Sequence, residues 1–215
     1  MLADPMGPLD PVSRRVSLLA AVVFAALGGT TFVEAQASTP SSGAEVEVRN
    51  VKFALVRPPS GGDAWLEATV ELTVAANSAA GAYGRFADRV QVALSLSVRR
   101  RDDEFDFYRA SAEAVSLEAG RAAFRFYLPP EILRREQMNT DPFAYAVDVS
   151  VRGRPTIVSV AALSSALRSA EVLRSFKDRV AQAAPGTDGV LVAQYLSPFI
   201  ASYGSDTPAF VRRER

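Results

Sequence analysis

Residues 66–74 read LEATVELTV, and every even-numbered position of this stretch carries an apolar side chain. The odd-numbered positions between them hold only glutamate and threonine. Successive side chains of a β-strand point to opposite faces of the sheet. The alternation therefore predicts a strand that turns one face to a hydrophobic core and the other to water.

The same period of two recurs elsewhere in the chain. Residues 90–98 and 143–151 also carry apolar side chains at every second position. Less regular alternation predicts further strands at 46–55, 105–108, 122–128 and 156–160. Within 46–55 the parity slips by one at Asn50, which reverses the two faces, so we expect a β-bulge or a bend there.

Together these segments indicate the fold class. About seven half-buried strands are typical of an immunoglobulin-like antiparallel β-sandwich, in which two sheets pack face to face. Strands of a doubly wound parallel sheet would instead read as continuous apolar runs, because both of their faces are buried. We therefore expect a mainly β protein with a sandwich domain at residues 45–161.

The pattern changes in residues 162–215. Apolar side chains then recur at three- and four-residue spacing, at Leu163, Ala166, Leu167, Ala170, Leu173, Phe176 and Val180. This spacing predicts an amphipathic helix, which Pro185 and Gly186 would end. The last thirty or so residues are apolar but interrupted by glycine and proline. We expect them to form an irregular tail that docks on the sandwich.

The amino-terminal segment, residues 1–37, has the three parts of a secretory signal peptide. Arg14 and Arg15 precede an apolar run at 16–27, and Ala35-Gln36-Ala37 offers a small-residue cleavage site. The alternative is an uncleaved membrane anchor, although the apolar run is short for a span of about 20 residues. Residues 38–44 are polar and predict a linker. The interpretation implies an exported protein of the periplasm or the cell surface.

The composition excludes several kinds of chemistry. The chain has no histidine and no cysteine, so it can form no Ser-His-Asp triad, no Cys-His dyad, no disulfide and no imidazole metal site. Its 24 basic residues balance 24 acidic ones, which does not favour nucleic-acid binding. A serine-lysine dyad could use only Lys52 or Lys177. No cofactor is expected.

The carboxylates remain as candidate catalytic or metal-binding groups. Asp102, Asp103, Glu104 and Asp106 cluster in one predicted turn, directly after the arginines of 99–101. Oxygen-rich loops can bind calcium, but these arginines would neutralise the carboxylates first. We therefore expect a solvated hairpin end and no metal site.

Four residues are candidates for contact with a partner. Trp65 lies on the polar face of its strand, where it could either join a binding surface or cover the rim of the core. The others, Phe210, Arg212 and Arg213, lie in the proline-broken tail. On the sequence alone, deleting residues 205–215 is expected to leave the fold intact and weaken a partner contact.

Three stretches of sequence resemble a known group of proteins. They are VKF at 51–53 with WLE at 65–67, FYLPPEI at 126–132, and TPAF at 207–210. In this order they are similar to exported immunoglobulin-like proteins encoded with type IV pilus-like systems in Verrucomicrobia. The resemblance implies a non-enzymatic envelope or pilus-associated component. Pilins that polymerise carry a short leader cut before a long apolar helix. Here the apolar run is short and its expected cleavage site follows it, which favours an accessory or assembly role.

The leading hypothesis is thus an exported, non-catalytic β-sandwich that acts through protein partners in an envelope or pilus system. Open sheet edges and the tail are its expected contact elements. Self-association into a homo-oligomer is compatible with it, and contact with a membrane would require an uncleaved amino terminus. The alternative is a secreted carbohydrate-binding or carboxylate-dependent sugar-active sandwich, with Trp65 or several tyrosines beside paired acids in a concave site.

Overall fold

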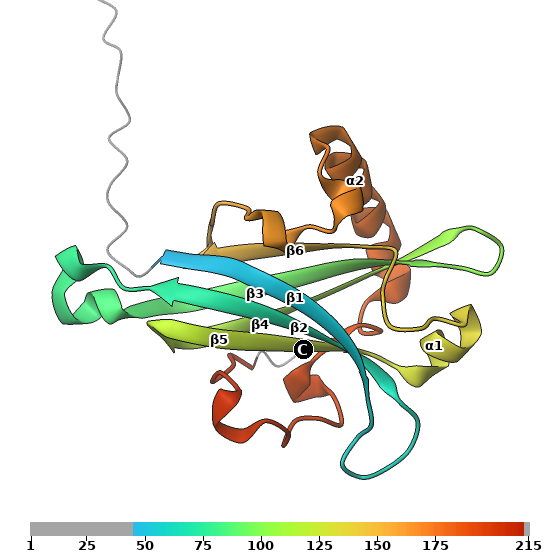
Figure 1. Cartoon of the computed structure of the whole chain (residues 1–215), viewed down its shortest axis with the longest axis horizontal. Coiled ribbons are helices and arrows are strands. Elements are labelled where there is room, and N and C mark those ends of the chain that lie inside the picture. Colours follow the sequence, from blue (N-terminus) through green and yellow to red (C-terminus); the bar gives the residue numbers. More distant parts are fainter. Residues whose placement is uncertain (1–44, 213–215) are drawn as a thin grey trace, which may run out of the picture. The chain divides into compact units, whose positions relative to one another are not determined.

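The structure is a computed structural model and describes residues 45–212, which fold into two packed antiparallel sheets (Figure 1). Sheet A has the strand order β1-β2-β5-β8 and comprises Glu45–Val56, Trp65–Ala75, Gly120–Leu128 and Val192–Ala193. Sheet B has the order β4-β3-β6-β7, and in chain order comprises β3 (Phe86–Arg99), β4 (Phe105–Glu118), β6 (Ala144–Val151) and β7 (Arg154–Pro155). The chain crosses repeatedly between the sheets, as in immunoglobulin-like sandwiches. The predicted fold class is confirmed.

The expected signal peptide at 1–37 and linker at 38–44 lie outside the described residues.

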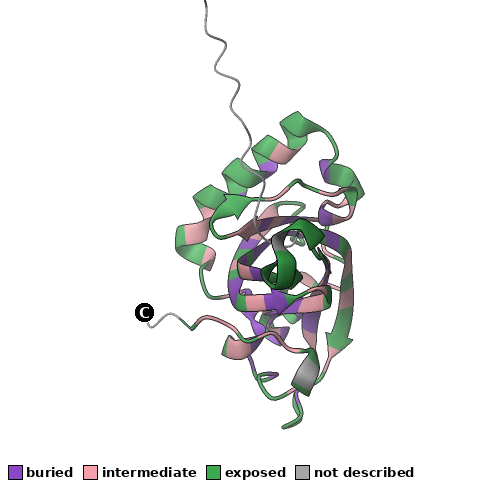
Figure 2. Ribbon diagram, turned by 90° about the vertical axis from the view of Figure 1, so that its left-hand side faces the viewer, coloured by how far each residue is buried: buried purple, intermediate pink, exposed green. Residues whose placement is uncertain are grey.

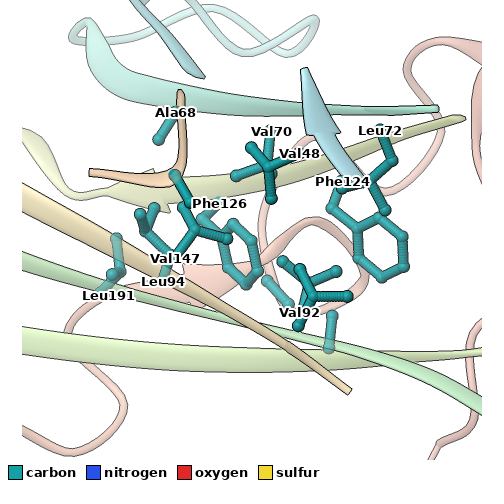
Figure 3. Packing of buried hydrophobic residues seen from close by; sticks show 14 of the residues in the cluster. Val48, Ala68, Val70, Leu72, Val92, Leu94, Phe124, Phe126, Val147 and Leu191 are labelled. Atoms are coloured by element: carbon teal, nitrogen blue, oxygen red, sulfur yellow. The ribbon is translucent and has the colours of Figure 1, made fainter. Parts of the chain in front are cut away.

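The core lies between the two sheets, and the period-two patterns supply it. The five apolar residues of 66–74 are each at most 2% exposed, and so are the five of 90–98. Figure 3 shows Ala68, Val70 and Leu72 from β2 among side chains of other strands, such as Phe124, Phe126 and Val147. The strands predicted at 66–74, 90–98 and 143–151 are confirmed as β2, β3 and β6.

The predicted irregularity in the first strand is also present. The pairing of β1 with β2 shifts register between Val48 and Asn50. Val48 is buried before the shift, and Val51 and Phe53 pack on the same core after it. One extra residue at this point keeps the apolar side chains on one face, which is what a β-bulge does.

Two strand predictions need correction, and one short strand was not predicted. Residues 156–160 form no strand, because β7 is confined to Arg154–Pro155 and a 3₁₀ turn begins at Val160. The strand expected at 105–108 continues to Glu118 as β4, where alanines take the inward positions and weaken the apolar pattern. The short β8 has only two residues, too few to show an alternating pattern in the sequence. It pairs with Phe126 and Tyr127 of β5.

The amphipathic helix exists but is shifted toward the carboxyl end. Helix α2 spans Ala170–Thr187, so Leu163 and Leu167 precede it and Pro185 lies inside its last turn. Leu163 instead bridges to Ala146 of β6, and this tertiary pairing competes with helix formation. Phe176 and Val180 of α2 pack on the outer face of sheet B, and the rest of the helix is mostly exposed (Figure 2).

A second helix, α1 at Pro130–Glu136, follows β5 directly. Pro129 and Pro130 follow the strand, and proline suits the first turn of a helix because its missing N–H is not needed there. The 3₁₀ helices occupy Ser78–Arg85, Val160–Ala162, Ser165–Leu167, Gln194–Leu196 and Gly204–Asp206. None of the helices within residues 45–212 is long and apolar enough to cross a membrane.

Candidate functional site

The carboxyl-terminal tail, residues 188–212, is built into the sandwich. Ala193 pairs with Phe126 at the edge of sheet A. Further along, the amide of Val115 in β4 donates to Ala209 O at 2.9 Å, and the amide of Val211 donates to Glu113 O at 2.7 Å. The tail thus contacts one edge strand of each sheet. Figure 1 shows this red segment beside β5, away from α2.

Aromatic side chains fix the tail on the outer face of sheet A. The ring of Phe199 stacks on Tyr127 with centroids 4.3 Å apart and an interplanar angle of 7°. Trp65 meets the same Phe199 ring edge-on, with centroids 6.2 Å apart. Trp65 is therefore half-buried beneath the chain's own tail, on the polar face of its strand as the alternation predicted.

Beneath the tail lies a buried carboxylate. Glu67 is only 7% exposed, and its Oε2 accepts hydrogen bonds from Tyr127 Oη at 2.7 Å and Tyr203 Oη at 2.6 Å. Thr69 Oγ1 donates to the other carboxylate oxygen at 3.0 Å. A buried carboxylate is costly without donors, and three hydroxyl groups supply them here. Tyr203 has φ = 70°, a left-handed conformation that is uncommon outside glycine, so the tail turns sharply where it delivers this hydroxyl.

The environment of this cluster changes the acidity of its tyrosines. Burial raises the pKa of Tyr203 to about 12, and the hydrogen bond to Glu67 adds to the effect. The pKa of Tyr127 is raised as well, first by burial and then by the same carboxylate. Both hydroxyls therefore stay protonated and donate to Glu67 throughout the physiological pH range.

One amide side chain holds the loop of the tail together. Gln194 is buried, and its Nε2 donates to Ser202 O at 2.9 Å, Thr207 Oγ1 at 3.1 Å and Phe199 O at 3.3 Å. These acceptors are five to thirteen residues further along the chain. The side chain therefore fixes the loop that carries Phe199 and Tyr203.

The structure places the predicted contact residues as follows. Phe210 is half-buried, with its ring 5.5 Å from that of Phe124 and 5.2 Å from that of Tyr195. Arg212 is exposed, and Arg213 lies outside the described residues. The structure does not bring Trp65 and Phe210 into contact, because Trp65 packs on Phe199 instead. A role of these residues in partner contact stays a prediction.

The lysines and carboxylates considered as catalytic or metal-binding candidates form ion pairs. Lys52 Nζ lies 2.6 Å from Glu71 Oε1, and Lys177 Nζ lies 2.5 Å from Asp148 Oδ1. In the acidic turn, Arg99 and Arg100 pair with Asp103 and Asp102, each at 2.8 Å. The arginines compensate the carboxylates as the sequence suggested. Within residues 45–212 there is no group of three or more acidic residues placed to hold a metal ion.

A hollow of about 1150 Å³ lies over the outer face of sheet B beside α2. Its wall carries Ser111, Ser150 and Tyr195 together with three carboxylates, Glu113, Asp148 and Asp188. Glu113 pairs with Arg89, and Asp148 pairs with Lys177. Trp65 is not part of this wall.

The outer edge of β1 is open along residues 51–56. Within residues 45–212, β2 is the only strand paired with β1, and no backbone hydrogen bond joins 51–56 to any segment other than β2. The earlier half of the strand is covered, since Ser159 Oγ donates to Val48 O at 2.7 Å. Leu55, in the open half, is 49% exposed. An edge strand with unpaired N–H and C=O groups can accept another strand.

Comparisons with known proteins support the fold. No protein-family model matches the sequence, and no curated protein does. A crystal structure of a protein from Akkermansia muciniphila is similar to this chain, with a TM-score of 0.60 and 12% sequence identity. The match covers 79% of this chain and 94% of that one. At this identity the similarity shows a shared fold.

Proposed function

We propose that this protein is a non-catalytic, exported component of an envelope or pilus system that binds a protein partner. It would act in the periplasm or at the cell surface as an accessory or assembly factor. The partner would contribute an extended segment that pairs with the open edge of β1. The observation that carries the proposal is this edge, residues 51–56, with its half-exposed Leu55.

The other edges of the sandwich are each bonded over part of their length. The tail bonds to β4 at Glu113 and Val115, β8 pairs with β5, and β7 pairs with β6. A strand edge left open supplies main-chain hydrogen bonds to an added strand, and the flanking side chains give specificity. Leu55 lies opposite the buried Leu66 of β2 but is itself 49% exposed. Its side chain is therefore available to give specificity to an added strand.

The comparisons favour the proposed class of protein. The three sequence stretches resemble pilus-associated proteins of Verrucomicrobia, and Akkermansia muciniphila, the source of the similar structure, is a verrucomicrobial bacterium. The polar groups under the tail are also consistent with a structural role, since Glu67 is saturated by hydroxyl donors and covered. The pilus association itself rests on the resemblance and is part of the proposal.

The test measures how much of an envelope protein the purified chain retains, and it compares the wild type with two matched variants. Leu55→Lys places a charge on the open edge, which hinders strand addition. Val172→Lys makes the same change at a similarly exposed position, 46%, on α2. We expect a partner that is retained by the wild type and by Val172→Lys, and lost with Leu55→Lys, while all three chains melt at similar temperatures. Equal retention by the three chains, or none by the wild type, would contradict the proposal.

The sugar-binding alternative makes a different prediction. The hollow beside α2 would then bind a glycan, and a glycan array probed with the purified chain would show specific signals. Binding that is abolished by Tyr195→Ala and unaffected by Leu55→Lys would favour this function over the proposed one.

A further inference from the structure

A second cavity, of about 740 Å³, lies where the tail passes over the beginning of β5. Its wall is rich in basic side chains, which come from β1 and from β5: Arg49, Lys52, Arg121 and Arg125. Asp206, Thr207 and Pro208 of the tail complete it on one side. The cavity is thus closed by the same tail that covers Glu67.

Arg125 is the unusual member of this wall. It is only 8% exposed, and its Cζ lies 3.8 Å from the centre of the Tyr203 ring. Two of its nitrogen atoms, Nε and Nη1, are buried and form no hydrogen bond with any described residue. Stacking on the tyrosine covers one face of the guanidinium but satisfies none of the N–H donors at its rim. A buried charge left in this state is costly.

The neighbouring acids do not supply the missing acceptors. Glu67 lies on the adjacent strand, yet its oxygens are bonded by hydroxyl groups and no ion pair joins it to Arg125 among the described residues. Two carboxylates in the cavity wall are paired elsewhere. Glu71 binds Lys52 at 2.6 Å, and Glu118 binds Arg85 at 2.6 Å.

The charge that remains in the cavity is positive. Outside those ion pairs the wall holds three arginines, at 49, 121 and 125, and one carboxylate, Asp206. Arginine presents N–H groups in a planar fork that matches the oxygens of phosphate and similar anions. The cavity thus combines N–H donors with a net positive charge.

We propose that this cavity binds a tetrahedral oxyanion, a phosphate or sulfate group, through Arg125 and Arg121. The anion would accept hydrogen bonds from the Arg125 guanidinium and balance the excess of arginines. Because Arg125 stacks on Tyr203, occupancy would also hold the tail on sheet A. The proposal concerns a ligand site separate from the open edge of β1 and does not depend on the proposed partner.

Titration calorimetry of the full chain with inorganic phosphate, at constant ionic strength, tests the proposal. Arg121→Gln alters an exposed wall residue that no described hydrogen bond or ion pair uses, so the variant should fold. Arg125→Gln removes the buried guanidinium. Arg174→Gln on α2 is the matched control, since this arginine is exposed and remote from the cavity wall. We expect saturable binding that weakens about tenfold or more in the two cavity variants and is unchanged in the control.

A second readout separates ligand contact from loss of folding. The Nε–H resonance of Arg125 in the wild-type chain should shift on addition of phosphate, and sulfate should give the same shift. Absence of saturable binding, equal affinity in all variants, an unmoved Arg125 resonance, or tighter binding of acetate than of phosphate would each overturn the proposal.

Discussion

Glu67 illustrates how a residue of the polar strand face becomes a buried group. On the sequence it is one of the glutamates that alternate with threonine along 66–74. In the structure the tail covers it and supplies Tyr203, while β5 supplies Tyr127. Hydrogen bonds to a charged group are among the stronger ones, each worth about 1.5–3 kcal/mol. The cluster therefore ties the tail to sheet A as well as accommodating the carboxylate.

The raised pKa of Tyr127 leads to a prediction at this scale. The unfolded chain releases the tyrosine proton above about pH 10, whereas the folded chain retains it because burial raises the pKa. Unfolding then releases a proton, so the free energy of unfolding falls as the pH rises past 10. Tyr127→Phe should make this fall shallower between pH 10 and 12, as measured by urea denaturation. Tyr83→Phe, at a side chain that is 85% exposed, is the control and should keep the wild-type slope. Identical slopes in both variants would contradict the assignment.

Among the elements, the segment 209–211 has the most direct structural role in the tail. It bonds to the edge of β4 and directs Phe210 against Phe124, a residue of the core. The sequence suggested that residues 205–215 could be removed without harm to the fold. The contacts oppose that expectation, because removal would expose both the β4 edge and part of the core.

Phe210→Ala tests this role. Loss of the ring should lower the free energy of unfolding by about 2–3 kcal/mol, somewhat less than for a fully buried phenylalanine. The amide of Val115, which donates to Ala209 O, should also exchange its hydrogen faster with solvent. Ile200→Ala, in an exposed part of the same tail, is the control and should change neither quantity appreciably. A variant Phe210→Ala as stable as the wild type would show that the tail is dispensable for folding.

At the scale of the whole molecule, the fold is stabilised without covalent cross-links. The chain has no cysteine, so no disulfide can contribute. The inner faces of the two sheets, the helix α2 and the tail supply the buried surface in its place. A fold of this kind needs no oxidising partner to form.

The proposed export predicts a mature chain that begins at Ser38. Expression of the full-length chain in a bacterial host, followed by amino-terminal sequencing of the exported form, measures this directly. Cleavage after Ala37 is expected because the small residues at 35 and 37 suit a signal peptidase. A chain that still carries residues 1–37 and sediments with membranes would instead support the tethered form.

The sandwich was readable from the sequence because alternation is a local property. In 66–74 and 90–98, successive side chains alternate between the two faces of the sheet, whatever the rest of the chain does. The less regular strands at 46–55 and 122–128 are confirmed as β1 and β5, and the predictions that need correction are those for which the alternation is weakest. The alanines at the inward positions of β4 are small, so the alternation is hard to recognise there. Leu163 and Leu167 continue the helical spacing in the sequence, although they precede the helix and contact β6 and its surroundings.

The candidate sites had no such local signal. Glu67, Arg125 and Tyr203 come from segments far apart in the chain, and each alone resembles a solvated surface residue. The apolar composition of the tail indicated only that it docks on the sandwich. Local periodicity therefore specified two half-buried sheets. The destination of the tail, the burial of Glu67 and Arg125 and the open edge of β1 depended on long-range contacts, because a side chain's exposure is set by whatever segment packs over it.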